Sequence, residues 1–415
     1  MKSFIINEQG ENAPVSEPGE RIMGKIKNSA RENAVKIKAL RRHLHERPEL
    51  SFHEYETAAF VKSQLDLLGI EWKPLAGTGV VALIKGNRKS GKVIALRADM
   101  DALPIREQNN VPYVSKNEGV MHACGHDVHT SSLLGVAMIL QSMTDDFGGT
   151  VKLIFQPAEE QLPGGASLMI AEGVLVDPTP SCVIGQHVMP FLETGKVAIR
   201  RGKHMASMDE LYVTVTGKGG HSAQPHQNVD PVFIAAHIVT SLQQIVSRNA
   251  NPTIPSVLSF GKFIANGSVN VTPDEVYLEG TFRTLDETWR DEAHKKMRKI
   301  AEGIAENFGG KCQFTIKRGY PFLVNEENLT DQLSSFMEEY VGKENVEAAD
   351  IWMAAEDFAY YSHVTNACFY LLGTGNKSKG IISSLHSSTF DIDEKSLELS
   401  AGLMVYIAVR KLGNF

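Results

Sequence analysis

Metal-binding side chains are concentrated in one short segment of this chain, residues 122–129, which reads His-Ala-Cys-Gly-His-Asp-Val-His. Three histidines, a cysteine and an aspartate within eight residues would be difficult to bury without a shared cation. Cys124 and His126 flank a single glycine, so both side chains can reach one ion from a tight turn. We therefore predict a metal site in this segment.

Two adjacent carboxylates, Glu159 and Glu160, follow the apolar run 151–155. Such a pair is often solvated loop charge, but Pro157 and the glycines at 164–165 fix the chain on either side of it. Because neighbouring residues point to different sides, one carboxylate can bind an ion while the other accepts a proton from water. This division of roles suits the hydrolysis of a stable amide.

Four further polar residues have ambiguous local contexts. Asp99 and Asp101 follow a strand-like run, where aspartate commonly caps a loop. His187 ends the apolar run 183–186, and His386 lies in the sequence Leu-His-Ser-Ser. A lone histidine in such a context is more often a buried core residue, so the local sequence leaves the roles of all four residues open.

The elements that carry these residues indicate a mixed α/β sheet covered on both faces. Helical periodicity over residues 31–69 is broken at Arg47-Pro48, which predicts two helices. Alternating patterns follow, with strands expected at 80–84, 93–97, 151–156 and 182–187 and helices at 130–141 and 166–172. The candidate residues then lie beyond the carboxyl ends of the strands, where sites in open α/β sheets collect.

A second unit is predicted over residues 205–318, inserted in a catalytic domain formed by residues 21–204 and 319–415. Its elements follow the β-α-β-β-α-β order of an α+β ferredoxin-like domain, with strands at 210–217, 256–264, 275–284 and 311–317 and helices at 230–248 and 286–308. A domain inserted in this way usually forms a lid.

The predicted lid carries three residues of interest. Its glycine-rich segment 217–220 lacks the residue order of a phosphate-binding loop, so we expect it to present His221 toward a cleft. Asn270 and Arg283 stand at strand ends, where turn, surface and functional roles are all open.

Length and composition indicate a two-domain protein without a nucleic-acid or membrane partner. The 415 residues exceed the size of one hydrophobic core, and the formal charge of -7 lacks the basic field of a nucleic-acid binder. No apolar run approaches a membrane span, and residues 1–20, which lack a signal-peptide core, are expected to form a flexible extension. Four cysteines without CxxC spacing favour a reducing, cytoplasmic location.

Taken together, these motifs resemble those of the M20 family of metallopeptidases, specifically its amidohydrolase branch of hippurate hydrolases, N-acyl-amino-acid deacylases and auxin-conjugate hydrolases. The resemblance covers nearly the whole chain. Seven segments carry it in order: residues 95–104, 122–127, 155–160, 219–226, 270–274, 356–360 and 385–386. Several motifs in the same order are far more specific than any one of them.

The resemblance implies two divalent metal ions per subunit with five ligands: Cys124, His126, Glu160, His187 and His386. It implies Glu159 as the general base and His221 as a group that reaches the substrate carbonyl from the lid. It associates further residues with substrate binding, namely His226, Asn270 and Arg283. It also implies a homodimer formed through the lid domain.

Two departures from the family pattern affect this assignment. Other branches have His-x-Asp where this chain has Asp99-Met-Asp101, so we expect Asp99, Asp101 and Asp127 to orient the ligands rather than to bind metal. The C-terminal motif commonly reads Leu-His-Ser-Pro, whereas Ser388 stands here in place of the proline and could shift the loop of His386. One thiolate among imidazoles and carboxylates suits zinc, manganese, nickel or cobalt.

The residues and the resemblance predict a metal-dependent amidohydrolase that cleaves N-acetyl or N-benzoyl amino acids to a carboxylic acid and a free amino acid. A dipeptidase or aminoacylase of the same family is one alternative, because the sequence does not choose among substrates. A catalytically silent metal-dependent binding protein is another, although it would need no general base at Glu159. A nucleophilic Cys124 is the third, but no orienting group follows the cysteine and histidine pair.

Overall fold

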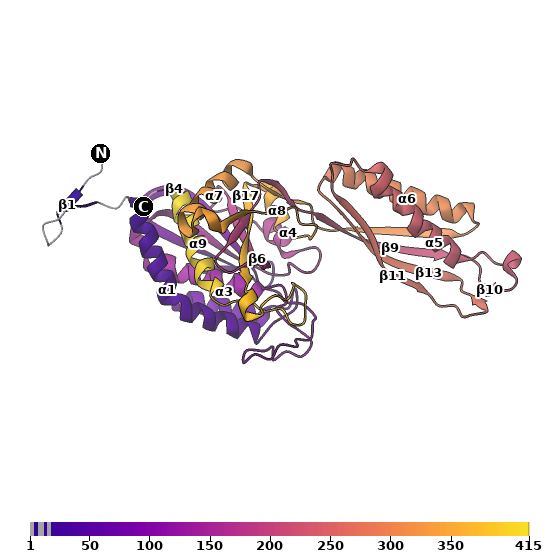
Figure 1. Cartoon of the computed structure of the whole chain (residues 1–415), viewed down its shortest axis with the longest axis horizontal. Coiled ribbons are helices and arrows are strands. Elements are labelled where there is room, and N and C mark those ends of the chain that lie inside the picture. The colour runs from indigo at the N-terminus through magenta and orange to yellow at the C-terminus, as the bar shows by residue number, and fades with distance from the viewer. Residues whose placement is uncertain (1–3, 7–11, 15–17, 414) are drawn as a thin grey trace. The chain divides into compact units, whose positions relative to one another are not determined.

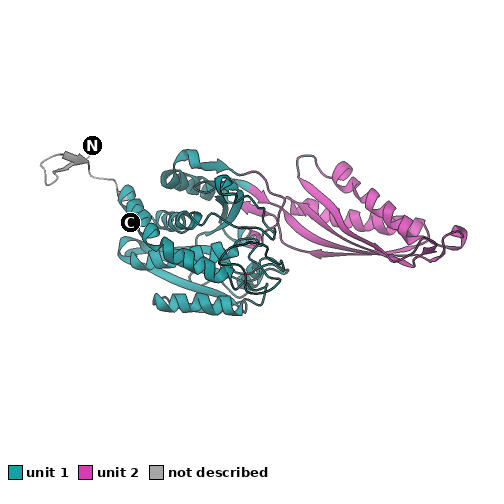
Figure 2. Cartoon of the chain, turned by 60° about the horizontal axis from the view of Figure 1, so that its bottom comes forward, with its two compact units in different colours: residues 1–202, 325–349, 361–415 teal, residues 203–324, 350–360 magenta. Residues whose placement is uncertain are grey.

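The computed structural model describes residues 4–6, 12–14, 18–413 and 415 of the chain (Figure 1). Most of the predicted extension, residues 1–20, lies outside the described residues; the described part contains the paired strands β1 (Phe4–Ile6) and β2 (Asn12–Pro14) and, from Pro18, the start of a helix, so the predicted flexible extension is wrong for residues 18–20. The chain divides into two compact units (Figure 2). The first comprises Met1–Gly202, Asn325–Ala349 and Tyr361–Phe415, and the second comprises Lys203–Val324 and Asp350–Tyr360.

A mixed sheet lies at the centre of the first unit, as the sequence predicted. Its seven strands follow the order β16-β7-β17-β6-β4-β3, with β5 paired to β4. β6 runs parallel to β4 and β17, whereas β3 is antiparallel to β4. The strands are β3 (Trp72–Leu75), β4 (Gly79–Asp99), β5 (Gly148–Gln156), β6 (Val183–Glu193), β7 (Val197–Ile199), β16 (Val346–Ala348) and β17 (Ala367–Gly375).

Strand β4 is long because its two halves flank β5. In its first half, Val80 pairs with Phe155 and the following residues pair with progressively earlier residues of β5. In its second half, from Val93 to Asp99, the residues pair with progressively later residues of β5. Alternate apolar side chains of both halves are buried in the core of the unit. Asp99 consequently stands beside Gln156, where two neighbouring strands end just before the candidate residues.

Helices α1 (Pro18–His45), α3 (His126–Ser142) and α9 (Ser396–Leu412) pack against one another (Figure 1). The predicted break near Arg47-Pro48 is confirmed, because α1 ends at His45 and α2 (Tyr55–Leu67) follows it, but α1 begins at Pro18 and not near residue 31. The other helices and helical turns here are α4 (Gly165–Ala171), α7 (Glu327–Val341), α8 (Ala359–Val364), Thr144–Asp146, Lys343–Asn345 and Lys377–Lys379. None of the helices in the described ranges has the length and apolar character that a membrane crossing requires.

The second unit contains a four-stranded sheet of order β11-β13-β9-β14, in which every pair is antiparallel. In chain order its main elements are β9 (Ser207–Thr216), α5 (Pro231–Leu242), β11 (Ser256–Ala265), β13 (Glu275–Thr284), α6 (Glu287–Asn307) and β14 (Lys311–Arg318). Smaller elements within this unit are β10 (Gly220–His221), β12 (Val271–Thr272) and the helical turns Pro225–Gln227 and Ile245–Asn249, while the paired strands β8 (Gly202–Met205) and β15 (Leu323–Asn325) lie at its borders with the first unit.

The segment Asp350–Tyr360 groups with the second unit, whereas the sequence pattern had assigned it to the catalytic domain. Backbone contacts explain the difference. Trp352 bridges to Met205, and the Ala206 N–H group is shared by the carbonyl oxygens of Trp352 and Ala354. Pairing between such distant segments leaves no trace in local hydrophobic periodicity.

Candidate metal centre

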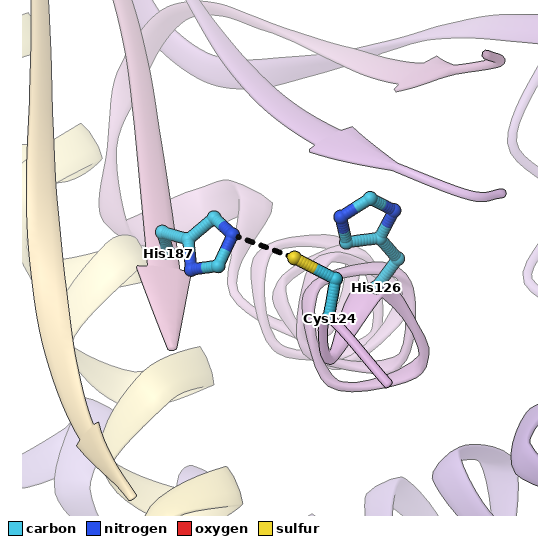
Figure 3. Close-up of side chains that lie close together, drawn as sticks. All are labelled: Cys124, His126 and His187. Atoms are coloured by element: carbon cyan, nitrogen blue, oxygen red, sulfur yellow. Dashed lines mark hydrogen bonds between the residues drawn. The ribbon is translucent and has the colours of Figure 1, made fainter. Parts of the chain in front are cut away.

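The segment predicted to bind metal spans the start of helix α3, so that Cys124 precedes the helix and His126 begins it. Gly125 is the N-cap residue, with a left-handed φ of 81°, and His126 is the first residue of the helix. This turn directs the side chains of Cys124 and His126 toward the same space (Figure 3). A glycine is required there, because an added Cβ would lie 2.4 Å from Val188 Cγ2.

Replacing Gly125 with alanine should therefore destabilise the fold and disturb the ligands on both sides. Left-handed backbone costs about 1–2 kcal/mol and overpacking about 1–3 kcal/mol, so we expect a loss of about 2–5 kcal/mol in urea unfolding. Gly303→Ala is the matched control. Gly303 lies in α6 with none of the described atoms within 4 Å of an added Cβ, so alanine should stabilise by about 0.5–1 kcal/mol. Equal effects of the two substitutions would contradict this account.

His187 approaches the same space from strand β6, which continues past it to Glu193. Its Nε2 lies 3.4 Å from Cys124 Sγ, and the ligand atoms of Cys124, His126 and His187 all lie within 4.8 Å of one another (Figure 3). All three side chains are buried. A thiol and two imidazoles at this spacing form a donor set that suits a transition-metal ion.

Hydrogen bonds leave the Nε2 atoms of both histidines facing this space. His187 Nδ1 donates to the Val188 carbonyl oxygen at 2.7 Å, and His126 Nδ1 bonds to Asp101 Oδ1 at 3.1 Å. His126 Nε2 and Glu160 Oε1 lie 4.0 Å apart, and both are buried with no hydrogen-bond partner among the described residues. Buried polar atoms are rarely left unsatisfied, so a cation held between them fits this donor set.

Electrostatics at the site favour a cation and disfavour a free thiolate. Burial lowers the pKa of His126, but Asp99 and Asp101 outweigh it and raise that pKa to about 10. Burial, then Glu160 and Glu159, raise the pKa of the Cys124 thiol well above its usual value, and burial lowers the pKa of His187. Because a nucleophilic cysteine needs a thiolate beside a protonated base, this pair does not support the Cys124 nucleophile.

The two carboxylates follow a residue in an unusual conformation. Ala158 has a left-handed φ of 49°, Glu159 is buried at 6% exposure, and Glu160 is partly exposed. The Glu160 N–H group donates to Asp101 Oδ2 at 2.9 Å. Glu160 Oε1 lies 3.4 Å from His386 Nε2, so Glu160 stands between the buried His126 and the more exposed His386.

His386 enters the group on a loop with its own left-handed residue. His386 has a φ of 60°, its N–H group donates to the Ala123 carbonyl at 2.8 Å, and its side chain is 54% exposed. Cys124, Glu160 and His386 offer ligand atoms within 4.8 Å of one another. Ser388, which replaces the expected proline, accepts a backbone hydrogen bond from Gln108 at 2.8 Å. The structure thus gathers all five predicted ligands in one place.

Asp99 and Asp101 form hydrogen bonds to residues in the segments that carry the proposed ligands. Asp101 bonds to His126 and to the Glu160 backbone, and Ser51 Oγ donates to its Oδ2 at 2.6 Å. Asp99 accepts from Arg97 Nη1 and from His129 Nδ1, each at 2.6 Å. His129 Nε2 in turn accepts the Val188 N–H at 3.0 Å, next to His187. A role in orienting the ligands is consistent with these contacts.

Asp127 requires a correction, because its carboxylate makes no hydrogen bond to a predicted ligand among the described residues. Its Oδ2 accepts from Arg41 Nε and is paired with His45 Nδ1, both at 2.7 Å. Successive helix residues point about 100° apart, which turns Asp127 away from His126 and toward helix α1. Arg41 also bonds to Asp391 at 3.0 Å, so it links α1 to the segment that follows His386.

Four predicted site residues lie in the second unit: His221, His226, Asn270 and Arg283. His221 and His226 are exposed. His221 Nδ1 accepts the Ala223 N–H at 3.1 Å, which leaves the proton of a neutral ring on Nε2. The Asn270 carbonyl accepts the Ser222 N–H at 3.0 Å, beside the His221 loop. The roles of these residues remain predictions.

Sequence patterns missed the residues that hold the ligands in place, which are Arg41, His45, Ser51, Glu54 and His129. Arg41, His45 and Glu54 are each 0% exposed. Buried charge of this kind requires specific partners, and some of these are distant in the chain, since Asp127 is 82 residues from His45 and Ala158 is 104 residues from Glu54. Only His129 carried a signal, because it lies in the histidine-rich segment.

The sequence model of peptidase family M20/M25/M40 matches residues 95–410, which is well over half of the chain. The chain belongs to this family. This M20 chain is 46% identical over 303 residues to an N-acyl-L-amino acid amidohydrolase of Geobacillus stearothermophilus, covering 72% of this chain and 80% of that protein. It is 38% identical over 377 residues to an N-acetylcysteine deacetylase of Bacillus subtilis, covering 89% and 95%.

A solved structure gives the same result for the fold. The Bacillus subtilis YXEP protein, described as a dinuclear metal-binding peptidase of the M20 family, matches with a TM-score of 0.78 and 35% identity. The match covers 93% of this chain and 100% of that chain. An M20 hydrolase fold with a mixed α/β sheet is therefore established for this chain.

Proposed function

We propose that this M20 enzyme is a metal-dependent amidohydrolase that cleaves N-acyl amino acids to a carboxylic acid and a free amino acid. The observation that best supports this proposal is the buried carboxylate of Glu159, which lies beside the clustered donors of Cys124, His126 and Glu160. The amidohydrolase and deacetylase names of its relatives support the same reaction class. An assay of the metal-reconstituted protein on a panel of substrates tests which acyl group and amino acid are preferred.

We propose that Cys124, His126, Glu160, His187 and His386 hold two divalent ions. When bound, such ions would supply Lewis acidity toward the amide carbonyl and the attacking water. Glu159 takes a proton from that water as it attacks the carbonyl carbon, and then delivers the proton to the leaving amine. The burial of Glu159 and the position of Glu160 near both His126 and His386 support this division of proton transfer and metal binding between the two neighbours.

The second unit is proposed to be a ferredoxin-like lid that supplies the substrate contacts. Its β-α-β-β-α-β element order and antiparallel sheet support that description. The Nε2–H group of neutral His221 would donate to the oxygen that becomes negatively charged as the amide is attacked. Asn270 and His226 would line the same region, and a homodimer would form through this unit.

Arg283 is proposed to bind the free carboxylate of the amino acid. It is half-buried, its Nε donates to Thr281 Oγ1 at 3.1 Å, and it forms no ion pair among the described residues. A guanidinium in this state can grip a carboxylate bidentately.

Arg283→Ala should raise KM for N-acyl amino acids by about 10- to 100-fold, because charge-assisted hydrogen bonds contribute about 1.5–3 kcal/mol. KM for the corresponding N-acyl amino acid amides should change little. Arg248→Ala, at an exposed arginine of the same unit, serves as the control. A similar rise for both substrate classes would refute a carboxylate contact.

The deciding experiment strips metal from the protein, restores zinc, manganese, nickel or cobalt separately, and assays N-acetyl amino acids, N-benzoyl amino acids and dipeptides. Turnover that returns with metal supports the amidohydrolase and identifies its acyl preference. Preferred cleavage of dipeptides would favour a dipeptidase, and substrate binding without turnover would favour a silent binding protein. Metal analysis of protein purified from its own source, light scattering and cell fractionation would test metal identity, the dimer and the cytoplasmic location.

A further inference from the structure

A fully buried carboxylate outside the proposed ligand set contacts the backbone just before Glu159. Glu54 is 0% exposed and lies at the N-cap of helix α2. Its Oε1 accepts the Ala158 N–H at 2.8 Å, although 104 residues separate the two in the chain. Its Oε2 accepts the Thr78 hydroxyl at 2.7 Å. Glu54 is thus a carboxylate held entirely by neutral donors.

Both backbone N–H groups that Glu54 Oε1 accepts belong to non-glycine residues with left-handed φ. Phe52 has a φ of 67° and donates at 3.0 Å, and Ala158 has a φ of 49°. Each such residue is strained by about 1–3 kcal/mol and persists only where its surroundings hold it. One oxygen atom therefore stabilises two strained backbone positions.

The Ala158 peptide is held from its other side as well. Its carbonyl accepts the Gly165 N–H at 2.9 Å, and a Cβ at Gly165 would lie 1.8 Å from the Pro157 carbonyl oxygen. The backbone on the far side of Glu159 is fixed by Asp101, which accepts the Glu160 N–H and is itself bonded by Ser51. Residues 51–54 thus reach this stretch in two ways: Glu54 contacts the Ala158 N–H directly, and Ser51 acts on the Glu160 N–H through Asp101.

We propose that Glu54 is a positioning residue that imposes the left-handed turn at Ala158 and thereby aims Glu159 toward the substrate and Glu160 toward the metal ions. This inference rests on the proposed function of Glu159 and Glu160. Adjacent side chains diverge to their required targets only if the peptide before them keeps this turn. Without the Oε1 contact, Ala158 relaxes toward negative φ and both carboxylates rotate with it.

Glu54→Ala should lower kcat by about 10- to 100-fold with KM nearly unchanged, as is typical for loss of a group that orients catalytic residues. The affinity of metal-stripped protein for Zn²⁺, measured by competition with a chromogenic chelator, should fall about 10-fold or more. Glu54→Gln keeps a carbonyl oxygen for both N–H groups and should retain most of kcat. If Glu54→Ala does not fold, Glu54→Asp, which withdraws the oxygen by one methylene, replaces it.

Two comparisons separate positioning from general destabilisation. Glu49 caps the same helix by accepting the Glu56 and Thr57 N–H groups at 3.1 and 2.7 Å, so Glu49→Ala is the matched control. Adding Ala158→Gly to Glu54→Ala should recover kcat about five-fold or more, because glycine adopts left-handed φ without the cost of about 1–2 kcal/mol.

The proposal is overturned if Glu54→Ala changes kcat and Zn²⁺ affinity no more than Glu49→Ala, or if glycine at 158 recovers nothing. Loss of kcat in Glu54→Gln equal to that in Glu54→Ala would also overturn it, because charge rather than geometry would then matter. A wild-type protein that takes up Zn²⁺ but hydrolyses no substrate would refute the proposed function alone, and the Zn²⁺ titrations would still decide the role of Glu54.

Discussion

Glu159→Gln is expected to lower kcat by about 10²- to 10⁴-fold, the contribution typical of a positioned general base. The amide of glutamine has nearly the size of the carboxylate but cannot accept the proton of the attacking water. Glu159 is buried, so bulk water offers little substitute. KM and the number of metal ions bound should change little, because Glu160 and the other proposed ligands stay in place. Steady-state kinetics and metal analysis of the same preparation test both expectations.

Glu172→Gln is the control for this substitution. The Glu172 carboxylate accepts the Ala76 N–H at 2.7 Å, so this exposed residue also makes a structural hydrogen bond from an acidic side chain. It belongs to none of the donor groups around the proposed ligands. Activity of Glu159→Gln within a few-fold of Glu172→Gln would remove Glu159 from the mechanism. Loss of bound metal in Glu159→Gln would make Glu159 a ligand instead.

The elements of the fold were predictable where burial imposes a regular spacing. Apolar periodicity gave the break between α1 and α2, and the apolar run before Glu159 is strand β5. Boundaries were less accurate where chemistry determines them. Helix α3 starts at His126 because Gly125 adopts a left-handed turn, a feature that periodicity alone does not detect.

The candidate ligands also differ in whether the local sequence alone could predict them. The clustered donors at Cys124 and His126 were predictable from spacing alone, because so many metal-binding groups rarely occur together by chance. His187 and His386 were assigned only through the family resemblance, since each is one histidine in an apolar or loop context. Their contacts with Cys124 Sγ and Glu160 Oε1 join segments far apart in the chain.

The residues that hold the ligands in place were the least predictable. A buried charged side chain is identified by the partners that it contacts in the fold and not by its neighbours in the sequence. Arg41 and Asp127 are 86 residues apart, and each would be costly to bury alone. The Arg41 guanidinium, after the opposing effect of burial, holds the pKa of the Asp127 carboxyl well below its usual range. Asp127 was expected to orient the metal ligands, but its hydrogen-bond partners Arg41 and His45 lie in helix α1, and no local sequence pattern points to them.

Cys124→Ala is expected to weaken metal binding and to lower kcat by more than about 100-fold, since even outer contacts to a metal ligand contribute about 10- to 100-fold. Cys124 Sγ lies 3.4 Å from His187 Nε2, and the substitution removes this neighbouring donor atom. Because burial and the nearby carboxylates raise the thiol pKa, metal uptake must displace the thiol proton. Calorimetry in buffers of different ionisation enthalpy should therefore show about one proton fewer released on Zn²⁺ binding by Cys124→Ala than by wild type.

Cys182→Ala is the matched control, because Cys182 is 2% exposed and burial raises the pKa of its thiol to about 11. Both substitutions remove one sulfur atom from a buried site, so their effects on thermal unfolding of metal-stripped protein should be similar. Only Cys124→Ala should lose metal, proton release and turnover. Unchanged Zn²⁺ affinity in Cys124→Ala would exclude the thiol from the donor set and leave the ions to imidazole and carboxylate ligands. Equal losses in both variants would instead point to damage of the shared core.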